Sequence, residues 1–316
     1  MRITLLAGGV GAARFLRGLA AAAPDAEITV VGNTADDITL FGLHVSPDLD
    51  TVMYTLGGGI SEEQGWGREG ETFTVLSELA AYGAGPDWFS LGDRDLATHI
   101  LRTSMLNAGL PLSAATRVLC QRWQTGVTLL PMSDDRVETQ VVLPADGQES
   151  TVHFQEWWVR MHAKVSAAGF IFAGADTAAP APGVIDAIST ADLVLFPPSN
   201  PVVSIGPILA VPGIAAAVRA QTVVGVSPII GGAPVRGMAD ACLTAIGVET
   251  SASAVGAHFG PRLLDGWLVD EQDKAAASSP DLAGIEVRAL PLYMTDLAAA
   301  AAIAGAALAL GEELAR

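Results

Sequence analysis

Apolar and polar positions at the N-terminus follow first a strand pattern and then a helix pattern. The apolar run RITLLA, residues 2–7, is broken by the glycine-rich turn GGVG. Residues 12–23 then show the helical spacing of apolar side chains, and Pro24 follows their end. A second apolar run, EITVVG at 27–32, completes a strand–helix–strand unit. This order predicts two parallel strands joined by a right-handed crossover.

The central part of the chain has a different pattern. Residues 57–115 are mostly helical in their spacing, and the strand-like segment GVTLLPMS follows at 126–133. Residues 137–159 then predict antiparallel strands around an Asp146-Gly147 turn. We therefore predict that residues 57–165 form a mixed helical and β cap, inserted into the sheet rather than folding independently.

Alternation of strands and helices returns in the last part of the chain. The apolar runs GFIFAG at 169–174, DLVLFPP at 192–198 and QTVVGVSP at 221–228 predict buried strands, the last two followed by loops rich in Ser, Pro and Gly. The sequence thus predicts an α/β fold with a Rossmann-like, mostly parallel sheet and helices on both faces. Its core is expected to comprise residues 1–56 and 166–316.

Composition and charge exclude several partners. Half of the 316 residues are hydrophobic, which is ample for a large core, and the net charge is −17. Such a chain repels nucleic acid and anionic membranes, and no basic patch stands out against that total. If it binds phosphates, backbone amides, helix N-termini and a divalent metal must supply much of the attraction.

The sequence also indicates a cytoplasmic location. Cys120 and Cys242 stand far apart and form no motif, so we expect two core thiols in a reducing compartment. The N-terminal apolar stretch is interrupted by Arg14 and Arg17, which argues for folded structure and against a signal peptide. The alanine-rich segment 297–310 is shorter than the roughly 20 apolar residues that a membrane span needs, and we expect a packed helix there.

The first candidate for binding chemistry is the glycine turn. Gly8, Gly9 and Gly11 would let a phosphate approach the backbone, and the next helix offers free amides and a positive dipole end. The third glycine of the G-x-G-x-x-G pattern is replaced by Arg14. A plain tight turn is the alternative, but the position at the end of the first strand favours a nucleotide-type ligand.

The second candidate is an acidic set. Asn33 ends the second strand, and Asp36, Asp37, Asp48 and Asp50 follow within eighteen residues. Carboxylate oxygens in a loop suit Mg²⁺, which takes one or two protein carboxylates and leaves room for substrate phosphates. Helix caps and solvated loop charges are the alternative, and not all four aspartates can be ligands.

The third candidate is a pair of rigid loops. Segment 196–209, FPPSNPVVSIGPIL, carries Ser199 and Asn200, and its Ser204-Ile205-Gly206 is expected to open a helix. The next strand ends similarly in SPIIGGAPVRG, residues 227–237. Polar loops at the carboxyl ends of neighbouring strands favour a ligand crevice over mere turns.

The fourth candidate is LGDRDLATH at 91–99. Asp93, Arg94 and Asp95 can cap and pair at a helix start, and His99 on an apolar helix is most simply structural. No Ser/His/acid set or cysteine nucleophile is indicated by the spacing. The site therefore suits positioning and charge neutralisation, as in phosphoryl transfer.

These stretches together resemble the CofD family, the transferases of coenzyme F-420 biosynthesis, over nearly the whole chain. The resemblance rests on GGVGAARFL, NTADD, SPDLDTVMYTLGG, LGDRDLATHILR, PMSDD, VHFQEWWVR, PSNPVVSIGPIL and SPIIGGAPVRGMAD. It implies a capped Rossmann-like sheet, usually a homodimer, and a Mg²⁺-dependent reaction. In that reaction a ribityl hydroxyl of the deazaflavin Fo attacks the phosphorus that bears the enolpyruvyl or lactyl group of a guanosine diphosphate-linked donor. GMP leaves, and dehydro-F-420-0 or F-420-0 forms; the wording of the motifs is closest to the type that uses the enolpyruvyl donor.

The resemblance also implies roles for individual residues. It gives Asp36 and Asp48 to the metal, and it places Asp50 near Fo, where it could orient or deprotonate the hydroxyl, with Asp37 as a partner. Arg94 and His99 are expected on the Fo side. Ser90 stands where many relatives have a basic residue, so either Arg94 compensates for it or the contact with Fo differs. The donor is expected on Gly8, Gly9, Gly11, Asn33, Ser199, Asn200, Ser204, Ile205 and Gly206.

Two other functions compete with this one. The N-terminal half also resembles the YvcK-like proteins, non-enzymatic regulators that bind UDP-sugars. The motifs PDLDTVMYTLGG, LGDRDLATH and HFQEWW favour the CofD side. A nicotinamide dehydrogenase would rest on the glycines alone, and the missing third glycine weakens it.

Overall fold

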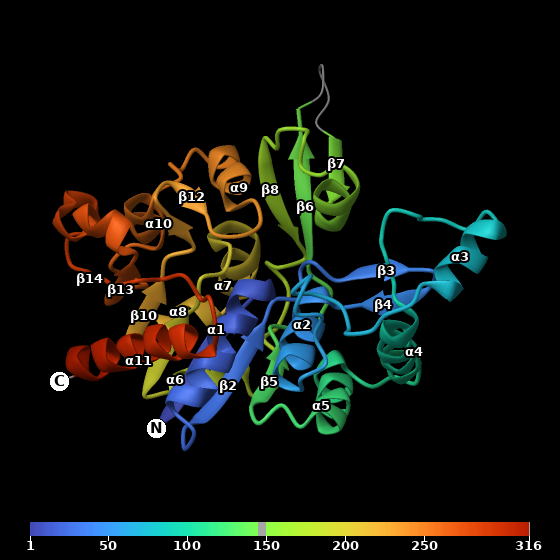
Figure 1. The fold of residues 1–316 in the computed structure, drawn as a ribbon, viewed down its shortest axis with the longest axis horizontal. Coiled ribbons are helices and arrows are strands. Elements are labelled where there is room, and N and C mark those ends of the chain that lie inside the picture. Colours follow the sequence, from blue (N-terminus) through green and yellow to red (C-terminus); the bar gives the residue numbers. More distant parts are fainter. Residues whose placement is uncertain (145–149, 316) are drawn as a thin grey trace.

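A seven-stranded sheet forms the centre of the molecule, and every neighbouring pair of its strands is parallel (Figure 1). The computed structural model describes residues 1–144 and 150–315. In the order β5-β2-β1-β9-β10-β13-β14, the strands are Thr128–Pro131, Glu27–Gly32, Arg2–Ala7, Leu193–Phe196, Val223–Val226, Gly266–Val269 and Glu286–Ala289. The predicted α/β, Rossmann-like fold is confirmed.

Helices cover both faces of this sheet (Figure 1). Successive strand side chains point to opposite faces, so Leu5 of β1 belongs to one core cluster and Leu6 to the other. The cluster around Leu5 includes side chains from α1 (Gly9–Ala22), α2 (Pro47–Leu56), α5 (Leu112–Trp123) and α11 (Leu297–Leu314). The cluster around Leu6 includes side chains from α6 (Val184–Ser189), α7 (Gly206–Ala210), α8 (Ile214–Val218), α9 (Ala239–Ala245) and α10 (Ala252–Phe259).

Helix α11 is part of this core. Among the described residues it is the one helix long and apolar enough, by length and composition, to cross a membrane. It packs instead directly on α1, because a Cβ added to Gly18 would overlap the backbone of Ala300. Ala304 and Leu310 are fully buried. The predicted packed helix at the C-terminal end is confirmed.

A smaller antiparallel sheet stands above the main one (Figure 1). Its central strand, β6 (Glu138–Leu143), pairs with β7 (Ser150–His153) on one side and β8 (Gly169–Ala173) on the other. A π-helical turn, Glu156–Arg160, follows β7. The predicted antiparallel pairing is confirmed, while the predicted turn at Asp146-Gly147 lies outside the described residues.

Two strands belong to a different sheet from the one predicted. The sequence places β5 in the cap, but β5 pairs in parallel with β2 and forms an edge of the main sheet. It follows α5, which supplies the crossover that a parallel pair requires. Conversely, β8 is predicted as a core strand but pairs antiparallel with β6, and none of its side chains is fully buried. The division of the chain at 57 and 166 stays a prediction.

An arm of the molecule extends from the main sheet on the side of β5 (Figure 1). It comprises the hairpin of β3 (Ile38–Leu40) and β4 (Leu43–Val45) with helices α3 (Thr74–Ala81) and α4 (Asp93–Asn107). Its own small core contains Leu40, Val45, Leu91 and Leu96, and α3 buries no side chain. The remaining short elements are a π-helical turn at Pro201–Ile205, strands β11 (Ile229–Ile230) and β12 (Ala233–Pro234), and 3₁₀ turns at Glu271–Ser278 and Pro280–Leu282.

The order of the strands locates the ligand crevice. From β1 the chain builds the sheet outward through β2 and β5, then returns to the other side of β1 with β9. In sheets of this type ligands bind outside the carboxyl ends of the strands at the point where the order reverses. The loops after β1 and β9 meet at that point.

Candidate functional site

The glycine turn after β1 lies in close contact with the loop after β9. Helix α1 begins at Gly9, whose φ of +65° belongs to the left-handed region that glycine adopts readily. A Cβ added to Gly8 would overlap the Ser204 side chain, and one added to Gly11 would overlap the Pro198 carbonyl oxygen. Glycine at these two positions therefore allows the loops to meet at the reversal point of the sheet.

Polar contacts fix the loop after β9. The Ser199 hydroxyl donates to the carbonyl oxygen of Gly8 at 2.9 Å. The Asn200 side chain caps the helical turn that follows, accepting from the backbone N–H groups of Val202 at 3.0 Å and Val203 at 3.3 Å. Both predicted side chains thus lie at the crevice and shape its wall.

The helix in this loop begins earlier than predicted. It starts as the π-helical turn at Pro201, not at Ser204, and continues as α7 from Gly206. The Asn200 cap and a proline at the first helical position explain the earlier start. Ile205 is 1% exposed, so the structure does not place its side chain at the surface of the crevice.

Asn33 connects three elements at the crevice. It follows β2 and is fully buried. Its side-chain amide donates to Asp48 Oδ2 at 3.0 Å and to the carbonyl oxygen of Val203 at 3.3 Å. Its own Oδ1 accepts from the N–H of Ala35 at 3.0 Å. The end of β2, the start of α2 and the loop after β9 are therefore held together by one side chain.

Asp36 and Asp48 carry unusual electrostatics. Burial raises the pKa of Asp36 well above its usual value, and the charge of Asp48 raises it further. Burial also raises the pKa of Asp48 to about 7, although hydrogen bonds from Asn33 and the Gly9 N–H oppose the shift. Asp36 Oδ1 is buried and has no hydrogen-bond partner. A cation bound beside these two buried carboxylates would stabilise their ionised forms.

The pair fits a divalent ion of the magnesium type. Mg²⁺ commonly takes one or two carboxylates and completes its octahedron with water and substrate phosphates. Within residues 1–144 and 150–315, no group of three or more His, Cys, Asp or Glu side chains is arranged to hold a metal. Asp36 and Asp48 would therefore supply the protein's ligands, and other oxygens would come from solvent and substrate.

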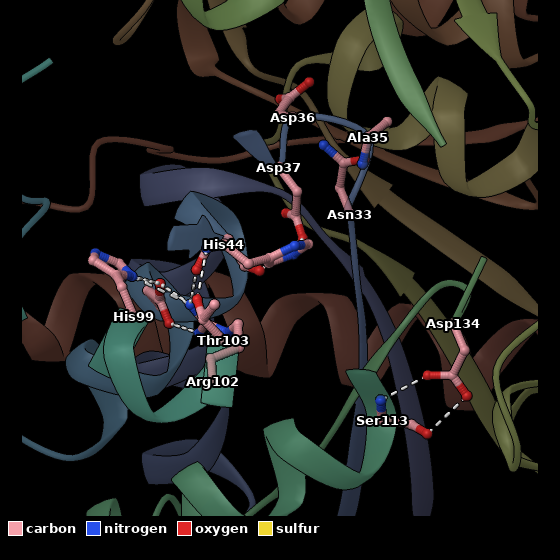
Figure 2. Close-up of polar contacts among 12 residues, drawn as sticks. Asn33, Ala35, Asp36, Asp37, His44, His99, Arg102, Thr103, Ser113 and Asp134 are labelled. Carbon is pink, nitrogen blue, oxygen red and sulfur yellow. Dashed lines mark hydrogen bonds and ion pairs between the residues drawn. The ribbon is translucent and has the colours of Figure 1, made fainter. Parts of the chain in front are cut away.

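The Asp37 side chain points away from that of Asp36, although its charge adds to the effect of burial in raising the pKa of both Asp36 and Asp48. In Figure 2 the side chains of Asp36 and Asp37 point to different sides of their loop, with Asp37 directed toward His44. Asp37 Oδ2 lies 2.8 Å from His44 Nε2 and accepts from the Ser46 hydroxyl at 2.7 Å. Its backbone carbonyl contacts His153 Nε2 at 3.1 Å. Asp37 thus ties the β3–β4 hairpin and β7 to the loop that carries Asp36.

Asp50 is the centre of a buried polar network. Arg102 on α4 engages both of its carboxylate oxygens, and the Nη1–Oδ2 distance is 3.0 Å. His99 Nδ1 lies 3.7 Å from Asp50 Oδ2, and its Nε2 lies 3.4 Å from Asp95 Oδ2. The hydroxyl of Tyr54 donates to Asp95 Oδ1 at 2.5 Å. We refer to Asp50, Arg102, His99, Asp95 and Tyr54 as the Asp50 network.

The three residues predicted on the Fo side are not equally placed. Asp50 and His99 lie together, but His99 is 1% exposed and both its ring nitrogens face carboxylates. A direct contact of His99 with an acceptor would require α4 to move. Arg94 is exposed at the start of α4, where its Nη1 donates to the carbonyl oxygen of Glu69 at 3.2 Å.

Arg102 and Tyr54 were not predicted as site residues. A signal for Arg102 exists in the sequence, since Asp95, His99 and Arg102 share one face of α4 at i, i+4 and i+7. Figure 2 shows Arg102 and His99 beside each other on that helix. The contact with Asp50 joins residues 52 positions apart, which periodicity within one helix cannot indicate.

The fold and the crevice define a class of protein. The chain is a Rossmann-like α/β protein whose polar loops and paired carboxylates meet at the carboxyl ends of β1, β2 and β9. Within this class, the family model described as "2-phospho-L-lactate transferase CofD" matches residues 3–289. The chain belongs to the CofD family of transferases.

Curated relatives match the chain over almost its full length. A phosphoenolpyruvate transferase of Streptomyces griseus is 65% identical over 316 residues, covering 99% of both chains. A protein with the same description from Thermobifida fusca is also 65% identical, again over 99% of each chain. One from Mycolicibacterium smegmatis is 54% identical over 98% of each chain.

Solved structures share the fold at lower identity. The crystal structure of protein BH3568 from Bacillus halodurans aligns with a TM-score of 0.62 and 18% identity, covering 97% of this chain and 99% of the other. A second structure of BH3568, described as a member of the upf0052 family, gives 0.63 over the same shares. This likeness concerns the fold alone.

Proposed function

We propose that this chain is the phosphoenolpyruvyl transferase of coenzyme F-420 biosynthesis. Its donor would be enolpyruvyl-diphosphoguanosine and its acceptor a ribityl hydroxyl of Fo, giving dehydro-F-420-0 and GMP. Support comes from relatives of 54–65% identity that are described as phosphoenolpyruvate transferases. The structural observation that carries the proposal is the Asp36–Asp48 pair at the sheet's reversal point, with Asp36 Oδ1 left without a partner.

The donor would lie across the glycine turn and the loop after β9. The N-terminal end of α1, a 14-residue helix, favours phosphate oxygens through its backbone N–H groups and its positive dipole end. Gly8 and Gly11 let the loop after β9 pack directly against this turn. Ser199 and Ser204 line the opposite wall, within contact of the turn.

Asp36 and Asp48 would hold Mg²⁺ against the donor's diphosphate. Bound there, the ion would offset the negative charge that develops on phosphoryl oxygens in the transition state. Asn33 donates to Asp48 and so fixes the direction of that carboxylate. Asp36, Asp48 and Asn33 would thus orient the carboxylates that bind the metal before the substrates bind.

The reaction would be an in-line displacement at phosphorus. The acceptor hydroxyl oxygen forms a bond to the phosphorus that bears the enolpyruvyl group, the bond from that phosphorus to GMP breaks, and the hydroxyl proton is released. Both oxygens of Asp50 are engaged by Arg102, which favours an orienting role for Asp50 over proton removal. The resemblance to the family further supports a homodimer, and the free thiols of Cys120 and Cys242 suit a cytoplasmic enzyme.

The mass of the product and the binding of ligands together test the transferase against the alternative, a YvcK-like regulator. Purified protein would be incubated with Fo, Mg²⁺ and either the enolpyruvyl or the lactyl donor, and the products weighed by mass spectrometry. We expect dehydro-F-420-0 from the enolpyruvyl donor at the higher rate. Formation of F-420-0 alone would reassign the donor. Tight binding of UDP-N-acetylglucosamine, with no binding of Fo and no product, would instead support a YvcK-like regulator.

A further inference from the structure

A glycine-rich segment crosses the first turns of α1. This segment, residues 59–70, is named the strap here. Its two ends approach each other, with the Glu69 N–H donating to the Gly59 carbonyl at 2.9 Å and the Ser61 N–H donating to Gly67 at 3.1 Å. The strap is therefore a closed loop that leaves α2 and returns toward α4.

The strap touches α1 at two points. Its Glu62 pairs with Arg17 at 2.6 Å. A Cβ added to its Gly65 would lie 3.1 Å from Val10 Cγ1, inside the glycine turn. Val10, Arg14 and Arg17 follow one another at i, i+4 and i+7, so they share a face of α1. Arg14 therefore lies between the two contacts, half-buried along the strap.

A second arginine reaches the strap from the other side of the crevice. Arg236, in the loop after β12, donates to the carbonyl oxygen of Gln64. Its Nη1 would be 2.8 Å from a Cβ on Gly65, the same position that packs on Val10. The motif SPIIGGAPVRG, which the sequence singles out as a ligand loop, thus brings one cation to the glycine turn.

Within the part of the chain that the structure describes, neither Arg14 nor Arg236 has an acidic partner. Among the ion pairs of the described residues, none includes Arg14 or Arg236, although Arg17 beside them has one. Burial and the charge of Arg14 lower the pKa of Arg236 from its usual value. Two guanidinium groups that repel each other, in a chain of net charge −17, indicate a place for an anion.

We propose that Arg14 and Arg236, together with the strap, bind an oxyanion of the transferred half of the donor. This inference rests on the proposed function. The donor brings two phosphate groups and a carboxylate to a crevice that already contains Asp36, Asp37 and Asp48. A metal at Asp36 and Asp48 would neutralise part of this negative charge. Cationic side chains beside the glycine turn would neutralise a further part. The oxyanion is the second phosphate or the enolpyruvyl carboxylate, and both suit the planar donor array of arginine.

Binding constants for three ligands test the pair. GMP, GDP and the enolpyruvyl donor would be titrated calorimetrically into wild type, Arg14→Gln, Arg236→Gln and Arg236→Lys, with Mg²⁺ present. We expect each Gln variant to weaken GDP or donor binding by roughly ten-fold or more, while GMP changes by less than about two-fold. A loss already seen with GDP assigns the second phosphate, and a loss seen with the donor alone assigns the carboxylate. Arg236→Lys should recover part of the affinity, because it restores the charge.

The matched control is Arg219→Gln. Arg219 is exposed and lies between α8 and the start of β10, at the amino ends of the strands and so opposite the crevice. This variant should bind all three ligands as wild type does. Unchanged binding of GDP and donor in the Arg14→Gln/Arg236→Gln double variant would overturn the proposed oxyanion site. A loss of GMP binding as large as the loss of GDP and donor binding would overturn it as well. If wild-type protein binds none of the three ligands, the proposed function itself is wrong. That result comes from wild type alone and does not depend on the variants.

Discussion

The Arg102 guanidinium on α4 forms a two-pronged ion pair with the Asp50 carboxylate on α2, and both side chains are buried. The pair joins the arm that carries α4 to the helix that presents Asp48. Burial alone would lower the pKa of Arg102, but the charge and hydrogen bonds of Asp50, and then the charge of Asp37, raise it above its usual value. The arm is therefore anchored to the candidate metal site by a charged contact, in addition to its small apolar core.

Removing one partner of this pair should be costly. Arg102→Met leaves the Asp50 charge buried and uncompensated, so we expect the free energy of unfolding to fall by about 3–5 kcal/mol. Urea denaturation followed by circular dichroism measures the change. The double variant Arg102→Met/Asp50→Leu removes both charges and should recover much of the loss. Arg102→Met within about 1 kcal/mol of wild type would contradict a buried ion pair at this position.

Asp48 should be required for turnover but not for folding. Asp48→Asn keeps an oxygen that can accept from Asn33, yet it removes the charge that would hold Mg²⁺. We expect kcat to fall by about 10²-fold or more, since charge stabilisation at the phosphoryl group is lost. Initial rates over a Mg²⁺ series measure this. Asp25→Asn, in the exposed turn before β2, is the control and should leave kcat unchanged. Near-normal rates in Asp48→Asn would remove Asp48 from the metal site.

Stability without metal should fall as pH rises toward neutrality. The pKa of Asp48 is raised to about 7 and that of Asp36 is also raised, so between about pH 4 and 7 the folded protein binds more protons than the unfolded chain. Unfolding therefore becomes easier across this window. Thermal melts in EDTA at pH 5, 6 and 7 measure the trend, which should be weaker in Asp48→Asn. Mg²⁺ should raise Tm more at pH 8 than at pH 5.5, because it binds the ionised carboxylates. A Tm independent of Mg²⁺ at pH 8 would contradict the site.

The contact between the two crevice loops should tolerate no side chain at Gly11. A Cβ there would overlap the carbonyl oxygen of Pro198, so Gly11→Ala must push backbone away from backbone. We expect a loss of about 1–3 kcal/mol in unfolding free energy together with weaker GDP binding. Gly305→Ala in α11 is the matched control, because a Cβ there meets nothing within 4 Å. It should be neutral or stabilising by up to about 1 kcal/mol. Equal stability of the two variants would show that the loops are not in contact.

The sequence predicts local order well and strand partners less well. The N-terminal strand–helix–strand unit follows directly from apolar spacing and a glycine turn. The spacing cannot tell that β5 joins β2 across 95 intervening residues or that β8 leaves the main sheet, because short apolar runs look alike in either sheet. The start of the helix at Pro201 was missed because the Asn200 cap was interpreted as a ligand contact alone.

The candidate site shows the same division. The crevice residues Gly8, Asn33 and Ser199 follow strand ends of the main sheet in the sequence, so the α/β pattern alone brings them together. Asp48 lies on α2, 15 residues after Asn33, and its place at the crevice is seen only from its contact with Asn33. Arg102 and Arg236 act through contacts with segments 52 and 172 residues away. Such contacts depend on how the arm and the strap dock, which no periodicity within one element records.

The most direct test of the central claim is the stoichiometry of GMP release. Protein at known concentration would receive the enolpyruvyl donor and Mg²⁺, first without Fo and then with it, while GMP and deazaflavin product are quantified. We expect little GMP before Fo is added and one GMP per dehydro-F-420-0 afterwards. No GMP from folded protein with Fo, donor and Mg²⁺ all present would contradict the proposed transfer.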